Sequence, residues 1–200
     1  MTDDVATLRA RLGARRRHVW PAQRRAGVLV PLIDDGGPLR LLLTRRTDLL
    51  RSHRGHVAFP GGGAEPGDAD IVETALREAE EEVALPRERV EVLGLLDDIP
   101  TVTGRQIVTP VIGRVVSLPG LVPQPLEVAR IFEVPLDALR VAERWVVRPH
   151  EDASGRTWPV YYFAWEDETL WGLSAYVTLQ LLSLTAGGSP HTLPEPFERG

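Results

Sequence analysis

The chain of 200 residues contains no cysteine and no lysine. Without cysteine it has neither disulfides nor zinc-thiolate sites, and we expect a cytoplasmic protein. Without lysine, all 23 basic side chains are arginines, so the choice of arginine at any one position carries little information. The same absence suggests a GC-rich coding genome and therefore a bacterial source.

Long apolar runs are also missing. No segment reaches the roughly 18 apolar residues of a membrane span, and the first twenty residues have no signal-peptide core. The net charge of −5 gives no reason to expect a nucleic-acid partner. We therefore expect no membrane or nucleic-acid partner, and a monomer or homodimer.

Length and composition predict one globular domain over residues 1–186, since 43% of the residues are apolar. Its first part, residues 1–17, is expected to be a helix that packs on the domain through Val5, Leu8 and Leu12. Residues 187–200 are rich in proline and polar side chains, which predicts a mobile tail.

Hydrophobic patterning predicts alternating strands and helices. The expected strands are residues 27–33, 39–45, 90–96, 107–116 and 158–165, and the expected helices after the N-terminal one are residues 71–83, 136–144 and 174–184. The first two strands flank Asp34-Asp35-Gly36-Gly37, a good hairpin turn. This order predicts an α/β fold with a mixed sheet between helices.

The helix over residues 71–83 has recognisable ends. Asp70 is a good N-cap, Glu73 stands where the return arm of a capping box is expected, and Pro86 prevents continuation. Around this helix Glu78, Glu81 and Glu82 share an arc of roughly 100° beside the apolar stripe.

Three carboxylates on one side repel one another unless a cation binds them. Carboxylate oxygens are ligands that Mg²⁺ and Mn²⁺ prefer, so the cluster is a candidate site for either ion. The alternative is an ordinary solvated helix face. Arg77 could orient these carboxylates or be a plain surface arginine.

A glycine triplet, Gly61, Gly62 and Gly63, precedes the helix. Glycine allows positive φ and close backbone approach, so this segment could turn onto the helix and offer amides to a phosphate. A triplet alone usually marks a turn. Its combination with the glutamate cluster points to diphosphate chemistry.

The segment resembles the Nudix box, in which glycine, glutamate, an Arg-Glu pair, a Glu-Glu pair, glycine and an apolar residue recur at fixed spacing. The matching positions are Gly62, Arg77, Glu78, Ala79, Glu81, Glu82 and Leu85. Three departures stand out: Asp68 replaces the first glutamate, one extra residue precedes Arg77, and Ala84 replaces the second glycine. A left-handed conformation at Ala84 would cost about 1 kcal/mol.

Residues 42–62, LLTRRTDLLRSHRGHVAFPGG, are similar to the signature of the coenzyme A pyrophosphatase branch of that family. Thr47 stands where the branch usually has serine or alanine. The segment carries Arg46, Arg51 and His53, which together favour an anionic ligand although each alone is weak evidence.

The resemblance implies a Nudix-type α/β/α sandwich and metal-dependent hydrolysis of coenzyme A to 3′,5′-ADP and 4′-phosphopantetheine. Glu78, Glu81 and Glu82 would hold Mg²⁺ or Mn²⁺, and Arg46, Arg51, His53, Gly61 and Gly62 would bind substrate. Glu81 and Glu127 are both candidate bases, and Arg77 completes the expected catalytic set. For Glu127 an exposed helix-cap glutamate is the alternative.

Two other functions remain open from the sequence. One is the same chemistry on ADP-ribose, NADH or a dinucleoside polyphosphate, and the other is a non-catalytic nucleotide-binding module. Trp171, Tyr161 and Tyr162 could pack against adenine or pantetheine, although aromatic residues of this kind are more often core.

Overall fold

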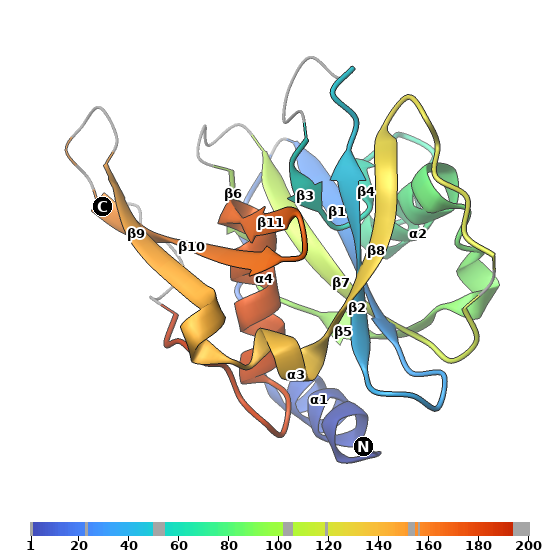
Figure 1. Ribbon diagram of the computed structural model, residues 1–200. Helices are drawn as coiled ribbons and strands as arrows, with labels where there is room; N and C mark the ends of the chain where they lie inside the picture. The colour runs from blue at the N-terminus through green and yellow to red at the C-terminus, as the bar shows by residue number, and fades with distance from the viewer. Residues whose placement is uncertain are drawn as a thin grey trace.

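The computed structural model describes residues 2–22, 24–49, 55–101, 106–118, 120–151, 155 and 157–193 (Figure 1). Along the chain the elements are α1 (Thr2–Ala14), β1 (Arg25–Ile33), β2 (Arg40–Arg46), β3 (Val57–Ala58), β4 (Gly61–Gly63), α2 (Ile71–Val83), β5 (Glu91–Leu95), β6 (Ile99–Pro100), β7 (Ile107–Val115), β8 (Val128–Pro135), α3 (Leu136–Leu139), β9 (Trp145–Glu151), β10 (Thr157–Trp165), β11 (Glu168–Trp171) and α4 (Gly172–Ser183).

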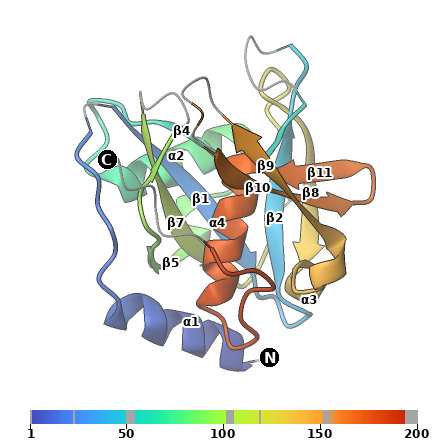
Figure 2. The same ribbon diagram turned by 90° about the vertical axis from the view of Figure 1, so that its left-hand side faces the viewer.

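The main sheet has the strand order β3-β2-β1-β7-β5, with β4 added to β1, β6 to β7 and β8 to β2. Strands β1 and β7 run parallel, and the remaining described pairs of this sheet are antiparallel. Helix α2 covers one face, while α1 and α4 lie on the other (Figures 1 and 2). The expected α/β/α sandwich with a mixed sheet is therefore confirmed.

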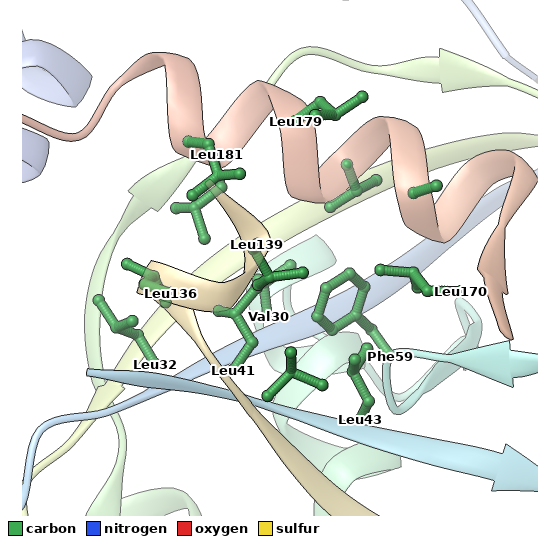
Figure 3. Close-up of a cluster of buried hydrophobic side chains, with 14 of the residues drawn as sticks. Val30, Leu32, Leu41, Leu43, Phe59, Leu136, Leu139, Leu170, Leu179 and Leu181 are labelled. Atoms are coloured by element: carbon green, nitrogen blue, oxygen red, sulfur yellow. The ribbon is translucent and has the colours of Figure 1, made fainter. Parts of the chain in front are cut away.

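Alternating side chains of the central strands feed a separate core on each face, as period-two alternation requires. On β1, Leu29 and Ile33 belong to the cluster that includes the apolar side of α2. Val30 and Leu32 belong to the larger cluster beneath α4, where α3 also contributes (Figure 3). All four of these side chains are fully buried.

Two facing glycines set the separation between α2 and the sheet. Gly27 of β1 pairs with Gly62 of β4. A Cβ on Gly27 would lie 2.6 Å from the Ile71 carbonyl oxygen and 3.0 Å from the Ala75 amide nitrogen. Only glycine allows so close an approach of helix backbone to strand, so α2 begins directly against β1.

Helix α2 has the limits predicted from the sequence. Asp70 Oδ1 accepts hydrogen bonds from the amides of Val72 and Glu73, each at 2.9 Å, as an N-cap does. Ala84 ends the helix in the left-handed region, with φ 54° and ψ 36°. The Glu73 side chain differs from expectation, because its carboxylate pairs with Arg87 rather than closing a capping box.

The second half of the chain departs further from the prediction. The single helix expected over residues 136–144 is the short α3 followed by a 3-10 turn at Ala142–Arg144, because Val141 between them is extended. A second sheet, β11-β10-β9, follows. Strands β8, β9 and β11 were not predicted, nor were the two- and three-residue strands β3, β4 and β6.

Helix α1 packs through the predicted face, with Val5, Leu8 and Leu12 buried. None of the helices in the described ranges is both long and apolar enough to span a bilayer. Of the predicted tail, residues 194–200 lie outside the described residues. In its described part the His191 ring lies 6.1 Å from that of Trp145.

Candidate functional site

Glu82 is the most enclosed of the predicted carboxylates, with 4% of its side chain exposed. Its Oε2 accepts a hydrogen bond from the Gly61 amide at 3.3 Å, and its Oε1 lies 3.5 Å from Arg46 Nη1. Burial raises the pKa of Glu82 to about 7, while Arg46 and the Gly61 amide oppose that rise. Glu82 therefore gains from any further positive charge placed beside it.

Glu78 lies one turn earlier and is 16% exposed. Its carboxylate rests against Gly62, where a Cβ would lie 2.5 Å from Glu78 Cδ. Burial raises the pKa of Glu78, an effect that Arg77 partly offsets and that Glu81 and Glu127 reinforce. Glycine at position 62 therefore makes room for this carboxylate.

Arg77 holds the neighbouring acids in place and is not a plain surface arginine. Its Nε and Nη2 donate to the two oxygens of Asp68 at 3.0 and 3.2 Å, and Nη2 also donates to the Gly63 carbonyl at 3.1 Å. Its Nη1 lies 3.1 Å from Glu78 and 3.0 Å from Glu81. Forked contacts of this kind fix geometry as well as charge.

Asp68 occupies the position of the first glutamate in the family pattern. It holds Arg77 in place, a role that the sequence analysis did not predict. Besides Arg77, it accepts hydrogen bonds from the Thr74 hydroxyl at 2.8 Å and the Glu65 amide at 2.9 Å. The Arg77 guanidinium holds the pKa of Asp68 well below its usual range. The signal was available, because position 68 has the spacing from Gly62 that the pattern gives its first glutamate.

Glu81 and Glu127 differ from Glu78 and Glu82 in exposure or in the element that carries them. Glu81 is 59% exposed, and its described ion pair is with Arg77. Glu127 directly precedes strand β8, so the alternative of a helix-cap glutamate is wrong. Its charge contributes to the raised pKa of both Glu78 and Glu82.

Backbone contacts fasten the Glu127 segment to the rest of the site. The Glu127 carbonyl accepts from the Thr47 amide at 2.9 Å, and the Gln124 amide donates to the Glu82 carbonyl at 2.9 Å. The segment is thereby tied both to the end of β2 and to α2.

The glycine triplet serves close packing rather than unusual torsion angles. None of Gly61, Gly62 and Gly63 has a positive φ, and the three form the short strand β4. The Gly61 amide, expected to face a phosphate, donates to Glu82 instead. The prediction of close approach is confirmed, and the prediction of a sharp glycine turn is wrong.

The donor set suits a hard divalent cation. Glu82 is buried and Glu78 is half-buried, both have raised pKa values, and a cation beside them would replace the stabilising proton. Across the described ranges, however, no three acidic or histidine side chains already converge as a metal site. Glu81 would have to turn from Arg77 to become a third ligand.

The predicted substrate-binding residues are only partly described. Arg46 lies at the site through its contact with Glu82. Arg51 and His53 fall outside the described residues. Among the aromatic candidates, Tyr161 is buried in the core, whereas Tyr162 and Trp171 are half-buried and belong to neither core cluster.

The chain resembles known proteins over most of its length. The family model of the NUDIX domain matches residues 23–154. A relative named uncharacterized Nudix hydrolase NudL, from Pectobacterium atrosepticum, is 46% identical over 159 residues, covering 80% of this chain and 81% of the relative. A protein of the same name from Photorhabdus laumondii is 41% identical over 184 residues, covering 90% and 95%.

A likeness among solved structures concerns the fold alone. The crystal structure of a MutT/nudix family protein from Enterococcus faecalis superposes with a TM-score of 0.56 at 15% identity, covering 86% of this chain and 65% of that one.

Proposed function

The chain belongs to the Nudix hydrolase family, and we propose that it cleaves the diphosphate bond of coenzyme A or a derivative of it. The products would be 3′,5′-ADP and 4′-phosphopantetheine. The observation that carries the proposal is the contact between Arg46 and Glu82. Arg46 belongs to the segment that is similar to the coenzyme A pyrophosphatase signature, and Glu82 belongs to the carboxylate helix, so phosphate recognition and the reaction would share one site.

In this proposal Glu78 and Glu82 hold Mg²⁺ or Mn²⁺, with Glu81 as a further ligand. The bound cation would supply positive charge to the diphosphate and lower the pKa of the attacking water. Arg77 positions Glu78 and Glu81 through the two ion pairs of its Nη1. Glu82 stays oriented because the Gly61 amide holds its Oε2.

The attacking water needs a proton acceptor near the metal ligands. Glu127 and Glu81 are the two candidates, and they differ in surroundings: Glu127 belongs to a segment that is hydrogen-bonded to the Glu82 backbone through Gln124, whereas Glu81 is largely exposed on Arg77. Glu127→Gln and Glu81→Gln separate them. Substitution of the true base should remove the fall of kcat at low pH, whereas substitution of the other glutamate should keep that fall.

Arg46 supplies the positive charge for the substrate's phosphates, with Arg51 and His53 as further contacts, since the Gly61 amide is already bound to Glu82. A guanidinium suits this task because it binds phosphate oxygens in pairs and stays charged. In the described structure Arg46 already faces a carboxylate, so an incoming metal–diphosphate unit would enter between two groups that attract it.

The decisive experiment compares turnover of coenzyme A and ADP-ribose at equal concentration with Mg²⁺ or Mn²⁺, and with a chelator as control. We expect faster coenzyme A hydrolysis that the chelator abolishes. Faster ADP-ribose turnover would assign the site to another nucleoside diphosphate, and binding without turnover would make the chain a nucleotide-binding module. When the reaction runs in ¹⁸O-water, mass spectrometry shows which product contains ¹⁸O and thereby identifies the attacked phosphorus.

A further inference from the structure

The outer face of the small sheet carries aromatic side chains close to the proposed reaction site. Neighbours on this face follow from the register: Tyr162 pairs with Trp171 of β11 and with Val146 of β9. The opposite face carries Phe163 and Leu170, which are buried in the core. Tyr162 and Trp171 thus lie on the face of the small sheet opposite to the one that packs on the core.

Tyr162 and Trp171 form a flat pair. Their rings are parallel to within 4°, with centroids 5.8 Å apart. The guanidinium carbon of Arg148, an exposed side chain, lies 5.3 Å from the centre of the Tyr162 ring. Two half-buried parallel rings with a cation beside them offer what a planar heteroaromatic ligand needs for stacking.

Two contacts connect this aromatic pair to the carboxylates. The His56 ring meets Trp171 edge-on at 4.7 Å, and the Arg46 amide donates to the His56 carbonyl at 2.9 Å. The Arg46 side chain then reaches Glu82. A continuous series of contacts therefore runs from Trp171 through His56 and Arg46 to Glu82.

The pair is also firmly mounted. Strand β11 packs against β3, beside which it lies in Figure 1. Arg130 of β8 binds Asp167 at 2.6 Å and Glu166 at 2.7 Å, both in the turn between β10 and β11. These contacts connect the β10–β11 turn to β8, which pairs with β2, the strand that ends at Arg46.

We propose that Trp171 and Tyr162, with Arg148, form the subsite on which the base of the nucleoside diphosphate substrate stacks. This inference rests on the proposed function, since it assumes that a diphosphate binds at Glu78 and Glu82. A ribose diphosphate without a base would forgo the stacking contact.

The test compares binding of ADP and ribose 5-diphosphate, which differ only in the base, by calorimetry with Mg²⁺. The full chain should prefer ADP by about 5- to 100-fold. Trp171→Leu keeps apolar volume against His56 but removes the aromatic face, so it should abolish the preference and leave ribose 5-diphosphate binding unchanged. Trp171→Phe should restore most of it.

A matched control lies on the same face of the sheet. Trp158, four residues before Tyr162 on β10, pairs with His150 and lies roughly 13 Å further along the strand. Trp158→Leu should keep the full preference for ADP. If Trp171→Leu fails to fold, Tyr162→Leu makes the same test from the other ring.

The proposal is overturned if folded Trp171→Leu retains the preference, or if Trp158→Leu loses it equally. A change in oligomeric state with unchanged preference would likewise reject it and make the face a contact between copies. Failure of the proposed function looks different: no nucleoside diphosphate would be hydrolysed, while the ADP preference and its loss in Trp171→Leu would remain.

Discussion

Gly62 lies against the carboxylate of Glu78, so closely that a Cβ at position 62 would sit 2.5 Å from Glu78 Cδ. The neighbouring Gly63 has open space where its Cβ would be. Two adjacent glycines of one short strand thus have different relations to the proposed metal ligands.

Gly62→Ala should displace Glu78 while leaving the fold intact, because the obstructing atoms end a flexible side chain. A shift of about 1 Å at the reacting centre is enough to lower kcat by about 100-fold. Steady-state kinetics across a Mg²⁺ series measures the effect, and thermal unfolding checks the fold. Gly63→Ala is the control and should behave as the unmodified chain; equal kinetics for both variants would refute this account of Gly62.

Asp68→Asn should loosen Arg77, because the amide keeps one acceptor oxygen while its NH2 group cannot accept the second hydrogen bond from the guanidinium. We expect kcat/KM to fall about tenfold, in line with the loss of a supporting contact around a metal site. The control removes the same charge two residues away. Asp70→Asn keeps a good N-cap and should leave activity unchanged. If kcat/KM fell equally in both variants, the change in net charge would explain the loss.

Glu82→Gln should remove hydrolysis and, without metal, stabilise the chain above neutral pH. The pKa of Glu82 rises from 4.5 to about 7 on folding, so its contribution to stability is complete below pH 4.5 and is lost as the pH rises towards 7. At pH 8 with a chelator, the variant should gain on the order of 2 kcal/mol. Denaturant unfolding at pH 5 and pH 8 measures the difference, and a gain equal at both would contradict the explanation.

The same titration gives metal binding a pH dependence. Because the cation must displace a proton from Glu82, Mn²⁺ affinity should rise between pH 6 and 8 by about tenfold. Calorimetric titrations at the two pH values test this. A pH-independent affinity would place the metal elsewhere.

Ala84→Gly should stabilise the chain by about 1 kcal/mol, because alanine occupies a left-handed position that glycine adopts without strain. The melting temperature should rise by about 2–4 °C. Ala79→Gly, inside the same helix, should instead lower the stability, because a glycine in a helix interior costs about 1 kcal/mol. If both changes had the same sign, strain at Ala84 would not be the cause.

Local signals predicted the structure well where they were strong. The limits of α2 follow from Asp70, Pro86 and the helical spacing of its apolar residues, and all of these act within a few residues. The hairpin of β1 and β2 follows equally from its turn. The proposed metal ligands Glu78 and Glu82 were found because one helix carries both.

Strand β8 was missed because its partner β2 lies far away in the chain. Glu127 was read as a possible helix cap for the same reason. Strands β9 and β11 were missed although their partner β10 is close in the chain. The contact of Gln124 with Glu82 cannot be read from sequence either, because it joins two backbones.

Gly27 makes no contact with a substrate in any of these proposals, yet α2 rests on it. Any larger residue there would lift the helix from the sheet at Ile71 and tilt every carboxylate that the helix bears. The size of the side chain at position 27 thus determines whether Glu78 and Glu82 can bind the same ion, although β1 itself contributes no ligand.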